Sequence, residues 1–189
     1  MAMEHHRLHP ATVCVYCASS ATVSPAIKEA GARTGRLLAE AGLALIYGGT
    51  TCGLMKITAD AHQAAGGRVI GIVPEFMVEQ GIAHPDLDEV VAVPDLRTRK
   101  ATMIERAGAF LVLPGGLGTL DELFDTLALK QLGLHRKPIV LLDTDGYWQP
   151  LLAFLRHGVA QRTIRAEHLD LLAIAATPEA ALAACLTGG

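Results

Sequence analysis

The chain has 189 residues, 51% of them hydrophobic and only 4% aromatic, and its formal net charge is −3 at pH 7. This length predicts a single domain over residues 1–189, able to bury about 70% of the surface that the unfolded chain would expose. The slightly negative charge argues against nucleic acid and anionic membranes as partners, because both attract positively charged proteins. We find no signal-peptide pattern and no apolar run of about 20 residues, so we expect a cytoplasmic protein without a membrane segment.

Cysteine and histidine spacing predicts no metal site. Cys14 and Cys17 form a Cys-x-x-Cys pair, but they lie in an apolar run expected to be a strand, which would turn them to opposite faces. We therefore interpret the four cysteines as small core residues rather than as a redox pair or zinc ligands. The eight histidines are scattered, and the stretch 1–10, which we expect to be disordered, holds three of them. We expect no metal and no cofactor.

In the first half of the chain, apolar runs alternate with helical patterns. Strands are expected at residues 12–17, 43–47 and 68–73. Ser24 as N-cap and Pro25 at the first helical position predict a helix to about Glu40, and a second helix should run to about residue 65.

The loop between the second strand and the second helix, Gly48–Gly53, has the glycine spacing of a P-loop. It lacks the Gly-Lys-Ser/Thr that should follow, which disfavours a nucleoside triphosphatase. After the third strand, Pro74 opens a polar segment through Glu79 that suits the rim of a ligand site.

A strand at residues 89–93 precedes a helix that begins with positive charge. Asp95 is its expected N-cap, and Arg97, Arg99 and Lys100 occupy its first turns. Cations there are unfavourable against the helix dipole by a few tenths of a kcal/mol each, and a bound anion would compensate. The alternative is an i,i+4 ion pair between Asp95 and Arg99, worth about 0.3–0.5 kcal/mol, with the other cations solvated.

The most informative stretch is Leu-Val-Leu-Pro-Gly-Gly-Leu-Gly-Thr-Leu-Asp-Glu, from Leu111 to Glu122. A strand at 109–113 breaks at the glycines, and a helix to about Leu132 follows at once, which is how parallel α/β sheets build phosphate sites. Glycines let backbone N–H groups approach an anion without obstruction by Cβ. The alternative is a capping box, in which Thr119 and Glu122 satisfy only the first N–H groups of their own helix.

The last part of the chain continues the alternation. We expect a strand at 137–142, a loop at 143–150 with Gly146-Tyr147-Trp148, a helix at 150–159, an apolar run at 169–175 and a helix from Pro178. Strands alternating with helices throughout predict a three-layer, Rossmann-like α/β fold with a doubly wound parallel sheet.

Several stretches together form a signature more specific than any one glycine motif: Val15–Ser20, Tyr47–Met55, Arg99-Lys100, Pro114–Glu122, Gln131–Gly133 and Lys137-Pro138. In this order they resemble the LONELY GUY (LOG) family of cytokinin-activating proteins, long mislabelled as lysine decarboxylases. The resemblance implies a homodimeric Rossmann-like protein. It also implies hydrolysis of the N-glycosidic bond of an adenosine 5′-monophosphate, often N6-prenylated, to free base and ribose 5-phosphate.

The sequence departs from the family pattern at a few positions. Leu96-Arg97-Thr98-Arg99-Lys100 stands where the family has Met-His-x-Arg-Lys, so the Arg-Lys pair is kept and the histidine is lost. Thr50 and Lys56 replace glycines, and Ala128-Leu129 replaces a Thr-Trp pair. These changes leave Arg99 and Glu122 intact and concern the preference for the base.

On this resemblance, Arg99 and Glu122 are the candidate catalytic residues. A carboxylate near C1′ would stabilise positive charge on the ribose and orient or deprotonate water, while a guanidinium would hold the charge of the departing base. The reverse assignment, with Arg99 orienting Glu122 or touching phosphate, stays open. The candidate substrate-binding residues, with the phosphate on the backbone N–H groups of residues 115–119, are Ser20, Gly48, Gly49, Glu79, Arg99, Lys100, Met103, Gly115, Gly116, Leu117, Gly118 and Thr119.

Two other functions would use parts of the same pattern. A molybdenum-cofactor carrier or nucleotide sensor of this fold would also need a phosphate cradle, but not Arg99 and Glu122 at one glycosidic bond. A lysine decarboxylase would hold pyridoxal phosphate on a lysine, and no lysine of this sequence lies in a convincing setting for that.

Overall fold

A computed structural model describes residues 11–187; the predicted disordered start at 1–10 lies outside them. The sheet has the strand order β4-β3-β2-β1-β5-β6-β7, and all its neighbouring strands are parallel. The strands are β1 (Thr12–Tyr16), β2 (Ala44–Tyr47), β3 (Val69–Pro74), β4 (Glu89–Val93), β5 (Ala109–Val112), β6 (Ile139–Leu142) and β7 (Ala173–Ala175). The helices are α1 (Pro25–Glu40), α2 (Gly53–Ala64), α3 (Glu75–Glu79), α4 (Leu96–Arg106), α5 (Leu117–Gln131), α6 (Gln149–Ala160) and α7 (Pro178–Thr187), with 3-10 segments η1 (Thr144–Gly146) and η2 (Ala166–Leu171).

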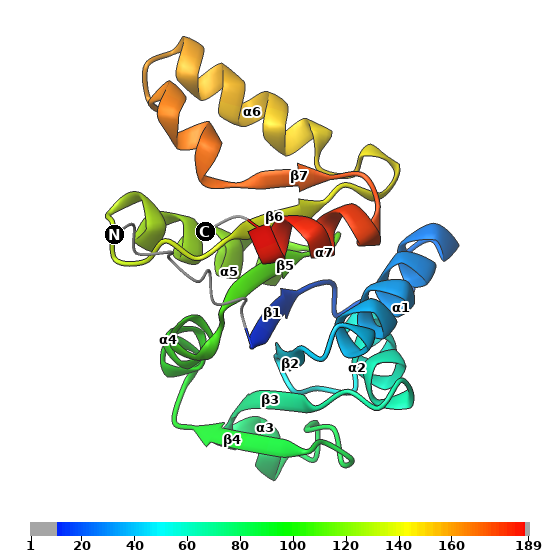
Figure 1. Cartoon of the computed structure of the whole chain (residues 1–189). Helices are drawn as coiled ribbons and strands as arrows, with labels where there is room; N and C mark the ends of the chain where they lie inside the picture. The colour runs from blue at the N-terminus through cyan, green and yellow to red at the C-terminus, as the bar shows by residue number, and fades with distance from the viewer. Residues whose placement is uncertain (1–10, 188–189) are drawn as a thin grey trace, which may run out of the picture.

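Helices cover both faces of the sheet, so the predicted three-layer fold is confirmed (Figure 1). Helices α1, α2 and α7 pack on one face and α4 and α5 on the other. Cys14 belongs to the core beneath α4 and α5, and Cys17 to the core beneath α1 and α2. The prediction that these two thiols point to opposite faces is therefore confirmed, and both are free. No helix within residues 11–187 is long and apolar enough to cross a membrane.

The strand order reverses at β1, which pairs with β2 on one side and with β5 on the other. The chain leaves β1 toward α1 on one face and leaves β5 toward α5 on the opposite face. Because the connections diverge, a crevice opens at the carboxyl ends of these strands, where ligands of open α/β sheets bind.

Most helix boundaries follow the local signals in the sequence. The side chain of Ser24 accepts from Ile27 N–H at the start of α1, and that of Asp95 accepts from Thr98 N–H at 2.7 Å at the start of α4. Gly133, with φ +75°, follows the end of α5, because only glycine adopts this left-handed conformation without strain.

Two sequence interpretations need correction. Helix α5 begins at Leu117 with Gly116 as N-cap, so Thr119 lies inside the first turn and the alternative of a capping box is wrong. The strand expected at 137–142 starts at Ile139, because Pro138 has no N–H to donate to the ladder. The side chain of Lys137 donates from Nζ to the carbonyl groups of Ile104 and Glu105 at the end of α4. The apolar run 169–175 begins as 3-10 helix and ends in β7, which pairs with β6 at the edge of the sheet.

Candidate functional site

A pocket of about 420 Å³ lies in the crevice where the strand order reverses. Its walls come from the loops after β1 and β2, from the α3 region, from α4 and from the first turns of α5. Arg99 and Glu122 both line it, as do Gly116, Leu117, Gly118 and Thr119. The two predicted catalytic residues and the predicted phosphate-binding turn therefore lie in the same pocket.

The start of α5 supplies the anion-binding part of this pocket. The first hydrogen bond of the helix runs from Leu120 N–H to Gly116 C=O at 3.0 Å. The backbone N–H groups of residues 116–119 find no acceptor within residues 11–187, as expected for a helix N-terminus. Free N–H groups and the positive end of the helix dipole together favour a phosphate.

Gly115 must be a glycine because the chain is tightly packed at this turn. A Cβ on Gly115 would lie 2.1 Å from the hydroxyl oxygen of Thr119, which is itself buried. The side chain of Thr119 thus packs over the glycine turn.

Glu122 lies one turn further along α5 with its half-buried carboxyl group in the pocket. Burial raises its pKa to about 7, and the positive charge of Arg99 acts in the opposite direction. Within the described part of the chain its carboxylate has neither a hydrogen bond nor an ion pair. A half-buried acid that has no partner is available to a substrate and titrates near neutral pH.

Arg99 reaches the pocket from α4 and is held by the sheet. Its Nε–H donates to the carbonyl oxygen of Ile72 on β3 at 3.1 Å, and its guanidinium lies against Gly48. Asp95 is occupied with the N–H of Thr98, so the alternative of an Asp95–Arg99 ion pair is wrong. The guanidinium is consequently free to bind a ligand with its remaining N–H groups.

Comparisons with known proteins agree with this geometry. A family model described as "Possible lysine decarboxylase" matches residues 55–185. The probable cytokinin riboside 5′-monophosphate phosphoribohydrolase LOGL2 of Oryza sativa subsp. japonica is 39% identical, over 88% of this chain and 68% of its own. The cytokinin riboside 5′-monophosphate phosphoribohydrolase LOG7 of Arabidopsis thaliana is 40% identical, over 83% of this chain and 72% of its own. This chain belongs to the LONELY GUY family.

Solved structures share the architecture at lower identity. The molybdenum cofactor carrier protein of Chlamydomonas reinhardtii superposes with a TM-score of 0.70, at 22% identity, over 92% of this chain and 94% of that one. The molybdenum cofactor binding protein of Rippkaea orientalis has a TM-score of 0.68, at 21% identity, over 89% and 91% of the two chains. At such identities the likeness shows the fold alone.

The wording of the matching family model does not fit the chemistry of the LONELY GUY pocket. A pyridoxal phosphate decarboxylase needs a lysine amine to form its internal imine. The pocket is lined by no lysine of the described chain. Lys56 and Lys100 are paired with carboxylates outside it, and Lys137 with the end of α4. The pocket therefore does not fit pyridoxal phosphate.

Some of the residues predicted from the LONELY GUY resemblance lie outside the pocket. Lys100 pairs with Asp121 at 2.9 Å and with Asp125 at 3.4 Å on α5, so its contacts do not support a role at the phosphate. Met103 is fully buried in the core, and Glu79 is exposed at the end of α3.

The remaining predicted residues border the site without lining it. The Ser20 hydroxyl bonds that of Thr22, and it is Ser19 that lines the pocket. Gly48 supports Arg99, and Gly49, with φ +70°, packs on Gly71 of β3.

The individual side chains of the wall opposite α5 were not predicted from the sequence. The chain after α3 pairs with the second glycine loop, through a bridge between Thr50 and Ala83 and a bond from His84 N–H to Gly49 C=O at 2.8 Å. This pairing places Ile82 beside Met77 on the pocket, and the other lining residues that were not singled out are Cys17, Ser19, Thr50, Cys52 and Met55. The motifs Val15–Ser20 and Tyr47–Met55 and the polar segment from Pro74 to Glu79 mark these stretches of chain, whereas Ile82 lies outside all of them.

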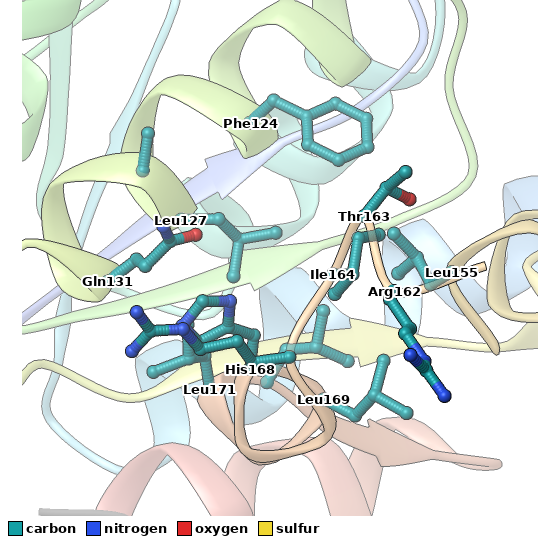
Figure 2. Close-up of a pocket in the computed structure, with 13 residues that line it drawn as sticks. Phe124, Leu127, Gln131, Leu155, Arg162, Thr163, Ile164, His168, Leu169 and Leu171 are labelled. Atoms are coloured by element: carbon teal, nitrogen blue, oxygen red, sulfur yellow. The ribbon is translucent and has the colours of Figure 1, made fainter. Parts of the chain in front are cut away.

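A second cavity, of about 460 Å³, lies against the middle and C-terminal part of α5 (Figure 2). Figure 2 shows Phe124 and Leu127 of α5 facing Leu155, Ile164 and the η2 segment. No carboxylate of the described chain and none of the candidate site residues lines it. It therefore lacks the acid that glycoside hydrolysis requires.

Gly48→Ala should impair the site while leaving the fold intact. A Cβ at this position would lie 1.8 Å from a terminal nitrogen of Arg99, so the guanidinium must move. The displaced atom is the end of a flexible side chain, so we expect a loss of unfolding free energy of about 1 kcal/mol or less. Turnover should fall by about 10²-fold, because the guanidinium is misplaced. Denaturant unfolding and release of base from AMP measure the two effects.

Gly31→Ala in α1 is the matched control. Its Cβ would meet the end of the Leu54 side chain at 2.5 Å, a similar intrusion that touches neither Arg99 nor Glu122. This variant should keep wild-type turnover. Equal turnover in Gly48→Ala and Gly31→Ala would show that the contact with Gly48 does not position Arg99.

Proposed function

We propose that this protein hydrolyses the N-glycosidic bond of adenosine 5′-monophosphates, releasing an adenine-type base and ribose 5-phosphate. The support is that an acid, a guanidinium and a helix N-terminus line one pocket of a size suited to a nucleotide. The relatives named above are phosphoribohydrolases of cytokinin riboside 5′-monophosphates, and this activity is carried over to the present chain.

In the proposed mechanism, the 5′-phosphate binds the free N–H groups at the start of α5. Water attacks C1′ of the ribose as the bond from C1′ to the purine nitrogen breaks, and the electron pair leaves with the base. Glu122 as a carboxylate stabilises the positive charge on the ribose and accepts a proton from the water. Arg99 donates hydrogen bonds to the base nitrogens, where negative charge accumulates. The departing base takes a proton from solvent, and Glu122 returns the proton of the attacking water to solvent, which restores the starting state.

The convergence of Arg99 and Glu122 on one pocket is the observation that carries this proposal. A carrier of a phosphorylated pterin needs the glycine turn but has no use for a half-buried acid that titrates near pH 7. A function as a cofactor carrier is therefore the weaker alternative, because only the similarity of the fold supports it.

Incubation with a panel of nucleotides tests the function. The purified protein should release free base from AMP and from N6-isopentenyl-AMP, and much less from adenosine, which lacks the phosphate. Chromatography of the free base gives the rates, and comparing the two nucleotides shows whether Met77 and Ile82 favour an apolar N6 substituent. Glu122→Gln protein prepared in parallel controls for contaminating hydrolases. No release from any monophosphate, together with a pterin retained on purification, would favour the carrier.

The same proposal includes a homodimer working in the cytoplasm. Its support is the resemblance to the LONELY GUY family, which implies a homodimer, together with the exposed apolar side chains of Leu132 (70%) and Leu134 (69%) just after α5. Free cysteines fit a reducing compartment. Light scattering should give twice the chain mass of 19.9 kDa.

A further inference from the structure

The glycine turn before α5 is bonded to the chain on both of its sides. The carbonyl oxygen of Pro114 accepts from Ala18 N–H, in the loop after β1, at 3.1 Å. The carbonyl oxygen of Gly115 accepts from the hydroxyl of Tyr147, in the turn after β6, at 2.8 Å. Two successive carbonyl groups are thus held from opposite sides, while the N–H groups that follow stay free.

The Tyr147 bond determines where one of those N–H groups points. In a trans peptide unit the C=O and the following N–H point in opposite directions, and the described chain has no cis peptide. Holding the Gly115 carbonyl on the Tyr147 side therefore directs the Gly116 N–H away from it. Gly116 lines the candidate pocket, and its N–H finds no acceptor among residues 11–187. A Gly-Gly peptide has little intrinsic preference for one orientation, so an external hydrogen bond decides it.

Tyr147 is itself held in place by its turn. Asp145 and Gly146 adopt φ values of +53° and +71°, which reverses the chain directly before it. A side-chain oxygen of Asp143 accepts from Trp148 N–H at 2.6 Å. The Tyr147 ring packs edge-on to the Trp148 ring, with centroids 4.9 Å apart, and Trp148 is only 2% exposed. The hydroxyl is consequently presented to Gly115 by a rigid support.

We propose that Tyr147 is a positioning residue for the phosphate group of the substrate. It fixes the Gly115–Gly116 peptide so that the Gly116 N–H joins those of Leu117, Gly118 and Thr119 in one anion cradle. The inference rests on the proposed function, which places the 5′-phosphate at this helix start. It adds a residue from the turn after β6 that does not itself touch the substrate.

Tyr147→Phe tests this inference, because it removes the hydroxyl and keeps the ring that packs on Trp148. Affinities for ribose 5-phosphate and for adenine are measured by titration calorimetry, and KM and kcat by hydrolysis of AMP. We expect the affinity for ribose 5-phosphate to fall about 3- to 10-fold, the range of one hydrogen bond to a neutral group, with adenine unaffected. KM for AMP should rise by a similar factor with kcat nearly unchanged. Thr163→Val is the control, since it also removes a hydroxyl bond to a backbone carbonyl, that of Gly158.

The outcomes separate this inference from the proposed function. If AMP is hydrolysed but Tyr147→Phe binds ribose 5-phosphate as tightly as wild type, the positioning role of Tyr147 is wrong and the proposed hydrolase activity is supported. If wild type binds ribose 5-phosphate, Tyr147→Phe binds it more weakly and no AMP is hydrolysed, the positioning role is supported and the proposed activity is wrong. Equal losses for adenine and ribose 5-phosphate, or no binding of ribose 5-phosphate by wild type, would also overturn the inference.

Discussion

Glu122→Gln should reduce release of adenine from AMP by about 10²- to 10⁴-fold, the range for loss of a positioned acid–base group. Glutamine has nearly the same shape but neither accepts the proton of water nor carries the charge that stabilises the ribose cation. KM should change little, because the phosphate is bound elsewhere in the pocket. Initial rates over a range of AMP concentrations measure both constants.

The same substitution should stabilise the protein at alkaline pH. Burial raises the pKa of Glu122 from 4.5 to about 7, so the folded state holds its proton more tightly than the unfolded state. The free energy of unfolding therefore falls as pH rises from about 4.5 to 7, by up to about 3 kcal/mol. The free energy of unfolding of Glu122→Gln does not fall in this way. The difference in unfolding free energy between the variant and wild type should therefore be absent at pH 4 and largest above pH 7. Urea unfolding at several pH values measures it.

Asp125→Asn is the matched control for that experiment. Asp125 is a partly exposed acid of the same helix that lies 3.4 Å from Lys100, and its charge is not among the causes of the raised pKa of Glu122. Its replacement should give no alkaline gain in stability. If Glu122→Gln and wild type respond to pH identically, Glu122 is not a buried acid with a raised pKa, and the pH dependence of catalysis would need another group.

Arg99→Ala should lower kcat by about 10²- to 10³-fold, the range for loss of a donor to charge developing in the transition state. The positive charge of Arg99 also lowers the pKa of Glu122, so without it that pKa should rise further. In the residual activity of Arg99→Ala, kcat/KM should therefore begin to fall at a higher pH on the acid side than it does in wild type. Arg99→Lys should recover part of kcat, since it keeps the charge but not the planar fork.

Arg106→Ala controls for loss of an arginine from the same helix. Arg106 lies in the last turn of α4 and pairs with Glu89 at 2.7 Å, away from the pocket. It should keep wild-type turnover. A pH profile of Arg99→Ala that coincides with that of wild type would argue that the two catalytic groups do not interact.

The parts of the site that depend on local chemistry could be predicted from the sequence. The glycine turn and the start of α5 are specified within a few residues, and the alternation of strands and helices places α4 and α5 at one edge of a parallel sheet. The pairing of Arg99 with Glu122 came from the resemblance to the LONELY GUY family, and both residues line the same pocket. Their catalytic roles stay predictions until the variants are measured.

Parts that depend on side-chain direction or long-range pairing could not be predicted. Arg99 and Lys100 are adjacent in the chain, but successive residues of a helix point about 100° apart, so one meets the sheet and the other meets α5. Ile82 reaches the pocket because Thr50 pairs with Ala83, and no motif recognised in the sequence includes it. Tyr147 acts through a backbone carbonyl, which leaves no pattern in the sequence.

The bond from Arg99 to the Ile72 carbonyl ties the guanidinium to an interior strand of the sheet rather than to the surface of its own helix. Substitutions on the solvent side of α4, such as at the exposed Arg97, need not move it. The outer surface of this helix can therefore change in charge while the two reacting groups keep their spacing.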